Sequence, residues 1–466
     1  MQQSERDLTK ESGLPARGKG QEGKGCHLPP ETQRAAMADA ARCTSTCSAL
    51  RFSPQNGTFR PSKPSICPCK LEFLLIFAGM KRIALLIIYI CTLLCQSCHD
   101  RKEDMPKPMP EAERTIIVYA AAENSLASFA TSDSAEMASA AGSIPEGCNL
   151  VLYMDRNTLP TITWMSKKDG VRLWHRYRND QDSADSLAML RTLSKIVKEF
   201  PAKRYGLVLW SHASGWIPRR KTFGIDNNSN SQYSNRGTEM EIPTLRRVLE
   251  QLPHMDFILF DACMMQSAEV AHELRHVTDY TIGSPSEIPG NGAPYDLIMP
   301  AMMKGDAIGI ASKYFEHYKY GSGVALSVVK CSMTDSLARA TAPLVESLWA
   351  GRGEVSTSEV QRYTTFDNSL HRPEAQDMRS MMHSALPDST LQAWESVLQS
   401  TVVWHGATAY WTSVYSGYEH HYLTDPDHYC CLSMFVPQKK YEPYKWNQDF
   451  RKCSWYKAAG WSTTGW

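Results

Sequence analysis

Uninterrupted apolar runs that stop abruptly at a polar residue dominate the middle of this chain. Leu207–Trp210 (LVLW) and Phe257–Phe260 (FILF) are apolar at every position. A strand that is apolar on consecutive residues is buried on both faces, as in a parallel sheet covered by helices. Because strand-like and helix-like patterns alternate along the chain, the sequence predicts an α/β fold with a mostly parallel sheet flanked by helices.

The patterns between these runs predict the remaining elements of the sheet. Thr161–Met165 and Val171–Tyr177 are predicted to form a hairpin that turns at Lys168-Asp169-Gly170, and polar Ile217–Gly237 is predicted to be a long loop. Ser183–Glu199 places its leucines on one helical face. Further helices are predicted at Ile242–Leu252, Met264–Leu274, Leu297–Tyr320 and Leu391–Gln399, and further strands at Asp279–Gly283, Gly323–Val329, Ala407–Val414 and Cys430–Val436.

The first hundred residues have a different character. Met1–Gly79 is rich in Pro, Gly, Ser, Arg and Cys and is predicted to be untranslated or disordered. Met80–Cys98 has two basic residues followed by a short apolar run, which is typical of a secretory signal. Its end, LCQSC, resembles a bacterial lipobox, which makes Cys98 the predicted lipidated residue and Met80 the predicted start. An ordinary signal peptide or a membrane anchor is the alternative. Residues 99–113 are charged and Pro-rich, as in a tether.

Composition narrows the function classes. The 466 residues carry a net charge of +1, so no electrostatic argument favours a nucleic-acid partner. Eight of the 14 cysteines lie at or before Cys98, which leaves too few for a disulfide framework. The spacings of the upstream cysteines match no strong zinc pattern, and no metal site is predicted from them.

Two chemically capable residues stand where the two apolar runs end. His212 follows the first run and Cys263 follows the second. The carboxyl ends of parallel strands meet at one edge of a sheet, where α/β proteins hold their ligands. A base beside a thiol makes a thiolate nucleophile, and a helix that starts at the thiol favours the same charge. The competing interpretation is a small buried cysteine and a structural core histidine.

These motifs resemble the clostripain family of cysteine peptidases, within the caspase-like clan. His-Ala-Ser-Gly-Trp follows one strand, Asp-Ala-Cys follows the next, and Cys263 comes about 50 residues after His212, as in caspases. The resemblance covers Arg114 to about Val329, with a weaker one to Trp466. It assigns residues 114–330 to a catalytic domain and 331–466 to an α+β appendage packed on the core. Further matching segments are Thr115–Leu126, Asn149–Arg156, Phe200–Tyr205 and Ser284–Asp296.

The resemblance implies a cysteine endopeptidase that uses a Cys263–His212 dyad. The oxyanion would be held by the backbone amides of Cys263 and Ala213, where the family often has Gly. Asp261 would lie in a pocket for a basic P1 residue, and a structural Asp is the alternative. The family often has a second acid where this chain has Asn291, a departure that weakens the charge complementarity. The resemblance requires no cofactor and allows a structural calcium ion.

Processing and location follow from the same reasoning. A pocket that prefers Arg or Lys would accept the basic side chains of the polar loop. Self-cleavage is therefore expected after Arg219, Arg220 or Lys221. The alternative is a basic surface turn that is not cleaved. The partners expected are peptide or protein substrates and a membrane, reached through the lipid, in the cell envelope at the periplasm or cell surface. The competing functions are a catalytically silent lipoprotein that binds peptides or glycans and, less compatible with a signal sequence, an intracellular caspase-like role.

Overall fold

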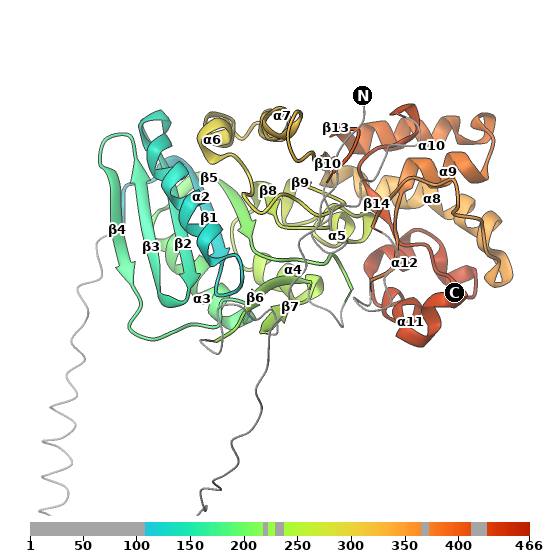
Figure 1. The fold of residues 1–466 in the computed structure, drawn as a ribbon, viewed down its shortest axis with the longest axis horizontal. Helices are drawn as coiled ribbons and strands as arrows, with labels where there is room; N and C mark the ends of the chain where they lie inside the picture. Colours follow the sequence, from blue (N-terminus) through green and yellow to red (C-terminus); the bar gives the residue numbers. More distant parts are fainter. Residues whose placement is uncertain (1–107, 218–221, 229–236, 365–371, 412–425) are drawn as a thin grey trace, which may run out of the picture. The chain divides into compact units, whose positions relative to one another are not determined.

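The structure is a computed structural model that describes residues 108–217, 222–228, 237–364, 372–411 and 426–466. The predicted extension, the signal sequence and the lipidation site Cys98 lie outside these ranges. Within the ranges, the architecture is a large central sheet with helices on both faces (Figure 1). The α/β class predicted from the sequence is therefore confirmed.

Nine strands form the central sheet, and its five middle strands are parallel. Antiparallel pairs extend the sheet at both edges. Four of these five parallel strands contain a run of consecutive apolar residues, as burial on both faces requires. In spatial order the strands are β13 (Val402–Ala407), β10 (Ala325–Lys330), β9 (Thr278–Gly283), β8 (Met255–Asp261), β5 (Ala202–Trp210), β1 (Ala112–Ala121), β2 (Cys148–Arg156), β3 (Thr158–Ser166) and β4 (Gly170–Arg176).

Two separate apolar cores cover the two faces of this sheet. One core packs under α2 (Ala127–Ser139), α6 (Tyr295–Lys304) and α7 (Ala307–Tyr318). The other is larger, and it extends into the helices of the C-terminal region. Each fully buried Leu, Ile or Met contributes roughly 1.5–3 kcal/mol to folding. The helices of the second core are α3 (Ser186–Glu199), α4 (Ile242–Leu249), α5 (Ala268–Glu273), α8 (Thr334–Trp349), α9 (Met378–Ala385), α10 (Asp388–Thr401), α11 (Trp446–Phe450) and α12 (Ser454–Ala458).

Helix ends follow local capping chemistry. The Asp185 side chain accepts hydrogen bonds from the amides of Leu187 and Ala188 and starts α3. Gly305, at φ +70°, ends α6, and the Asp306 side chain then caps α7. The predicted helical stretch Leu297–Tyr320 is therefore two helices with a glycine break between them.

Four sequence predictions are wrong in detail. The helix expected at Met264–Leu274 begins only at Ala268, because the amides of Met264 and Gln266 bond to Ser286 O and Ser284 O instead of continuing a helix. The predicted loop Ile217–Gly237 contains β6 (Phe223–Asp226), which pairs with β7 (Thr238–Met240). Of the two late strands, the first is β13 at Val402–Ala407, directly after α10, and the second is only the two-residue β14 (Ser433–Met434).

The C-terminal region takes part in the central sheet. Its strand β13 pairs antiparallel with β10 at one edge. A small sheet of β11 (Arg362–Thr364), β12 (Ala375–Asp377) and β14 lies in the same region, and Ser433 of β14 forms a bridge with Ser267, just before α5. In the part of the chain that the structure describes, no helix combines the length and the apolar character needed to cross a membrane.

Candidate active site

His212 stands on a loop anchored to the neighbouring strand. Strand β5 ends at Trp210, and Ser211 Oγ donates to Ala121 O at 2.7 Å and accepts from the amide of Ile225 at 3.2 Å. These bonds fix the backbone immediately before the imidazole. His212 is half-buried, and its Nε2 lies 2.9 Å from Ser125 Oγ, which follows β1.

Cys263 stands on the matching loop after β8. Trp210 is the register partner of Asp261, so the two strands end level and release His212 and Cys263 at the same edge. Met264, the residue after Cys263, has φ +61°. This left-handed backbone conformation is strained for residues other than glycine.

The two loops are in contact. Gly215 has φ +81°, and a Cβ placed on it would lie 3.0 Å from Met264 O. Only glycine therefore combines this backbone conformation with this close approach. The contact holds the histidine loop against the cysteine loop within a few residues of both functional side chains.

The surroundings of Cys263 raise the pKa of its thiol. Burial is the largest cause and raises the pKa of Cys263 to about 12; the charges of Glu287 and Asp261 raise it further, while the amide of Ile288 and the charge of Arg372 lower it. The expectation that an adjacent helix favours a thiolate is wrong here, because α5 begins only at Ala268 and is six residues long. Activation must therefore come from another group.

A buried ion pair lies next to the thiol. Arg372 Nη1 is 2.7 Å from Glu287 Oε1, and both side chains are largely buried. Glu287 belongs to the loop after β9, whereas Arg372 comes from the C-terminal region. Sequence reasoning missed this pair, because nothing in the local pattern of either segment links positions that far apart in the chain.

The backbone amides of Ala213 and Cys263 are the predicted oxyanion donors. Ala213 pairs with Phe223 through the amides of Ser214 and Gly224, so the bridge does not use the Ala213 amide. The amide of Cys263 likewise has no backbone acceptor among the bonds that link the described loops. An oxyanion hole needs donors of this kind, already in place and not satisfied by the protein.

Asp261 lies in a buried acidic cluster on the α2–α6–α7 side of the sheet. Its carboxylate accepts from the amide of Ala293 at 3.0 Å and from Tyr295 Oη at 2.8 Å. Asp133, from α2, accepts from Trp210 Nε1 at 2.7 Å. A Cβ on Gly292 would lie 2.7 Å from Asp261 Oδ2 and 3.2 Å from Asp133 Oδ2, so both carboxyls flank one point of the backbone.

The negative charge of this cluster is not balanced by its surroundings, as the raised pKa values of both carboxyls indicate. Burial, together with the charge of Asp261, raises the pKa of Asp133 to about 8. Burial also raises the pKa of Asp261 to about 6, against the lowering effect of its hydrogen bonds. Asn291 is exposed on the neighbouring loop. The second acid near Asp261 is thus Asp133, which sequence reasoning missed because it lies on a different helix far from the motif.

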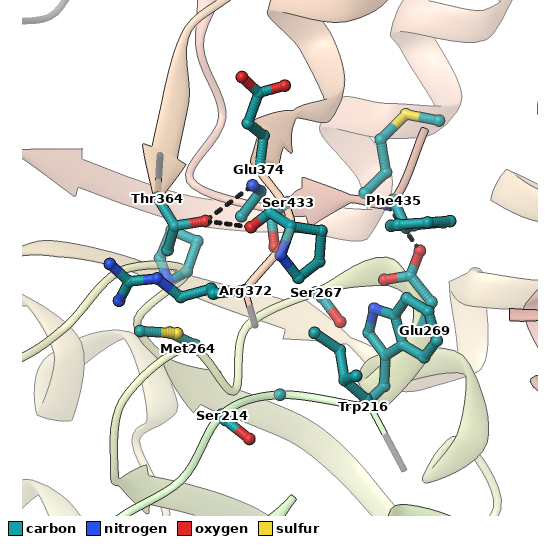
Figure 2. A pocket seen from close by; sticks show the side chains of 16 residues that line it. Ser214, Trp216, Met264, Ser267, Glu269, Thr364, Arg372, Glu374, Ser433 and Phe435 are labelled. Atoms are coloured by element: carbon teal, nitrogen blue, oxygen red, sulfur yellow. Dashed lines mark hydrogen bonds between the residues drawn. The ribbon is translucent and has the colours of Figure 1, made fainter. Parts of the chain in front are cut away.

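A cavity opens beside the loops that carry His212 and Cys263 (Figure 2). One wall comes from Ser214–Ile217 and Met264, and the opposite wall comes from the C-terminal region. Glu269 of α5 lies at one end, beside the Trp216 ring. The C-terminal wall is formed by Thr364, Arg372, Pro373, Glu374, Ala375, Ser433, Met434 and Phe435.

A second group of acids has the chemistry of a cation site. Carboxylate oxygens of Glu123, Asp155 and Asp180 lie within 4.8 Å of one another. Among the described residues, Asp155 Oδ1 is buried and has no hydrogen-bond donor. Burial first, and then the charges of Asp226, Asp180 and Glu123, raise the pKa of Asp155 to about 9. Oxygen donors of this type suit a hard cation such as Ca²⁺.

The remaining candidate positions lie outside the described residues or away from the sheet edge that carries His212 and Cys263. Arg219, Arg220 and Lys221 fall outside the described ranges. Of the remaining histidines, His272 is buried between Ser454 and Asp335, which is a structural role.

Comparisons with known proteins agree with this geometry. The model of the clostripain family matches residues 118–466. The structure of a secreted C11 cysteine protease from Bacteroides thetaiotaomicron, in complex with an irreversible peptide inhibitor, is similar: identity is 31%, TM-score is 0.64, and the match covers 76% of this chain and 100% of that one. An inactive zymogen C11 protease from Parabacteroides distasonis shares 31% identity at TM-score 0.63, over 75% and 99% of the two chains. The comparison with curated proteins found no match.

Proposed function

Because this chain belongs to the clostripain family of cysteine peptidases, we propose that Cys263 and His212 form its catalytic dyad and that it cleaves peptides after Arg or Lys. One observation carries the proposal. The strands β5 and β8 end at the same level of the sheet, and the loops that follow them, which carry His212 and Cys263, are in contact at Gly215 and Met264. A thiol and a base presented together are the requirement for nucleophilic attack on an amide.

The chemistry follows from these positions. The His212 imidazole takes the thiol proton, and the Cys263 thiolate attacks the scissile carbonyl carbon. The amides of Ala213 and Cys263 hold the resulting oxyanion. The imidazolium then protonates the leaving amine, and a water molecule, deprotonated by the imidazole, hydrolyses the thioester. Ser125 Oγ, at 2.9 Å from His212 Nε2, is placed to orient the ring.

The acidic cluster supports a basic P1 residue. Asp133 and Asp261 are buried together, and their raised pKa values reflect the cost of charging two carboxyls without a cation. An arginine or lysine side chain would supply that cation through charge-assisted hydrogen bonds. In this proposal Asp133 takes the place of the acid that the family often has at the position of Asn291.

The protonated thiol supports a precursor that needs activation. The pKa of Cys263 is raised to about 12, so the described chain keeps its nucleophile neutral. The relative from Parabacteroides distasonis is an inactive zymogen. We infer that self-cleavage after Arg219, Arg220 or Lys221 releases the loop between the two catalytic strands.

Calcium and location complete the proposal. The residues Glu123, Asp155 and Asp180 would hold a structural Ca²⁺, and the buried Oδ1 of Asp155, which accepts no hydrogen bond from the described residues, fits that role.

The relative from Bacteroides thetaiotaomicron is secreted. This supports export of the present chain, with lipid attached at Cys98 holding it at the cell envelope.

The experiment is a P1-scanning assay on the purified protein. Peptides with Arg, Lys, Gln or Ala at P1 are compared for wild type, Cys263→Ala and His212→Ala. Cys148→Ala is the control, because Cys148 is a free cysteine at the start of β2, at the opposite end of the sheet from the two loops. We expect cleavage after Arg and Lys, loss of at least about 10³-fold in both dyad variants, and unchanged activity in the control. Full activity of Cys263→Ala would contradict the mechanism and favour the silent binding protein.

A further inference from the structure

The cavity beside the dyad contains one acid without a cation. Glu269 Oε1 accepts from the amide of Phe435 at 2.9 Å, whereas its Oε2 is buried and has no donor among the described residues. No described Lys or Arg forms a salt bridge with it. Figure 2 shows its second oxygen directed toward the middle of the cavity. An unsatisfied buried carboxylate oxygen in a cavity is a ready acceptor for a ligand.

The other charged side chains of the cavity are already compensated. Arg372 pairs with Glu287 at 2.7 Å. Glu374 pairs with Lys440 at 2.9 Å and with Arg362 at 3.2 Å. A ligand entering the cavity therefore meets one uncompensated acid, Glu269.

The remaining walls are largely apolar. The rings of Trp216 and Phe435 pack edge to face, with centroids 5.1 Å apart, and Met264, Ile217 and Pro373 also line the space. Apolar walls with a single acid suit a long aliphatic side chain that ends in a cation, because its methylenes are buried while its end pairs with the carboxylate.

Position identifies which substrate residue would enter. The cavity starts at Met264, directly after the nucleophile, and at Ser214, two residues after His212. Its aromatic wall belongs to the core on the α3–α4–α5 side of the sheet, whereas Tyr295 and Tyr314, which bond Asp261, belong to the core on the other side. Successive side chains of an extended peptide point to opposite sides.

We propose that this cavity is a second substrate subsite, in which Glu269 binds a lysine or arginine side chain from the residue adjacent to P1. The inference rests on the proposed function, in which P1 lies on the Asp261 side. The C-terminal region would then contribute directly to specificity, through the wall opposite His212.

Ionisation of Glu269 gives the subsite a pH signature. Burial raises the pKa of Glu269 to about 7, against the lowering effect of hydrogen bonds from the amides of Phe435 and Glu269 and from the Ser267 side chain. Below that pH the carboxyl is neutral and binds a cation weakly; above it the carboxylate is charged. A basic side chain next to P1 should therefore gain affinity between pH 6 and pH 8, while an uncharged side chain of the same length should not.

The test measures binding without cleavage. The Cys263→Ala protein is titrated by calorimetry with peptides that share Arg at P1 and carry either Arg or norleucine at P2, or at P1′. We expect the Arg peptide to bind about tenfold more tightly at one of these two positions, a difference of about 1.4 kcal/mol, because its cation forms a charged hydrogen bond with Glu269. In Glu269→Gln, combined with Cys263→Ala, this ratio should fall to about one.

The controls separate structure from recognition. Glu273→Gln removes a carboxyl from the same helix that pairs with Arg246 outside the cavity, and it should leave the ratio unchanged. Glu269→Asp keeps a carboxyl but withdraws it by one methylene, and it should reduce the ratio even if Glu269→Gln folds poorly. A ratio of one at both positions, or one that survives in folded Glu269→Gln, overturns the subsite. If Arg and Ala at P1 bind equally while the ratio persists, the P1 assignment fails and the subsite stands.

Discussion

At the residue scale, the thiol of Cys263 depends on charges supplied by segments distant in the chain. Glu287 raises its pKa and Arg372 lowers it, and these two side chains form a buried ion pair. Removing one partner of such a pair leaves the other charged and buried, which costs about 3–5 kcal/mol. The arginine therefore stabilises the fold and limits the basicity of the nucleophile.

We predict that Arg372→Ala lowers the free energy of unfolding by about 3–5 kcal/mol, measured by denaturant titration. Because the charge of Arg372 lowers the pKa of Cys263, its loss should also slow alkylation of the thiol at a fixed pH. Lys203→Ala is the matched control: its pair with Glu113 is exposed to solvent, so the midpoint of its denaturant titration should stay close to that of the wild type. Equal stability of the two variants would contradict a buried pair.

The acids Asp133 and Asp261 also predict a pH dependence. Their pKa values are raised to about 8 and about 6, so on acidification they become neutral and lose attraction for a cation. The KM for Arg at P1 should therefore fall as pH rises from 6 to 8.5, while the KM for Gln at P1 stays constant. In Asp133→Asn this difference should shrink. A parallel pH profile for both substrates would show that the cluster does not contact P1.

The same shifts have an opposite effect on folding. An acid whose pKa is raised in the folded state contributes a penalty that grows as pH rises above its unfolded value of about 4. Without substrate, Asp133→Asn should thus be more stable than wild type near pH 8. In the wild type, the charged Asp133 carboxylate lowers the free energy of unfolding, and a cationic substrate side chain would offset this cost.

At the scale of elements, the sequence predicted the strands better than the segments that follow them. Apolar runs such as Leu207–Trp210 fix a buried strand wherever it lies, so β5 and β8 appeared where expected. The loop after Cys263 was misassigned as helix, because its amides are satisfied by Ser284 and Ser286, a tertiary contact invisible in local periodicity. His212 and Cys263 were identifiable from strand ends, whereas Asp133 and Arg372 reach the site only through folding.

Calcium binding is predicted at the ends of β1 and β2. Adding Ca²⁺ should raise the thermal unfolding midpoint of the wild type, since a cation that binds only the folded state stabilises it by mass action. In Asp155→Asn this increase should be lost, although the variant should be no less stable without calcium, because the buried acid has a pKa raised to about 9. An identical increase in both proteins would place calcium elsewhere.

At the scale of the whole molecule, the predicted cleavage lies between adjacent strands of one sheet. β5 precedes the loop and β8 follows it, and the two pair in parallel along their length. Cutting the loop therefore removes a covalent link without removing any pairing. The two products should remain one particle.

We predict that purified wild type shows two fragments on a denaturing gel and a single peak by size exclusion. Cys263→Ala should stay intact, and so should the triple variant Arg219→Gln, Arg220→Gln, Lys221→Gln, with its dyad unchanged. Adding active wild type to Cys263→Ala distinguishes cutting between molecules from cutting within one. A triple variant that stays uncut yet has full activity would exclude activation by this cleavage.

The position of β13 has a consequence for timing. The strand comes after residue 401, yet it forms the edge of the sheet that carries the dyad, and Arg372 and Phe435 complete the surroundings of the site. A ribosome makes about 5–20 residues per second, and non-local strand pairing is slow. His212 and Cys263 are therefore both synthesised before the strand that completes this edge of their sheet. Assembly of the full sheet has to wait for a segment made well over a hundred residues after Cys263.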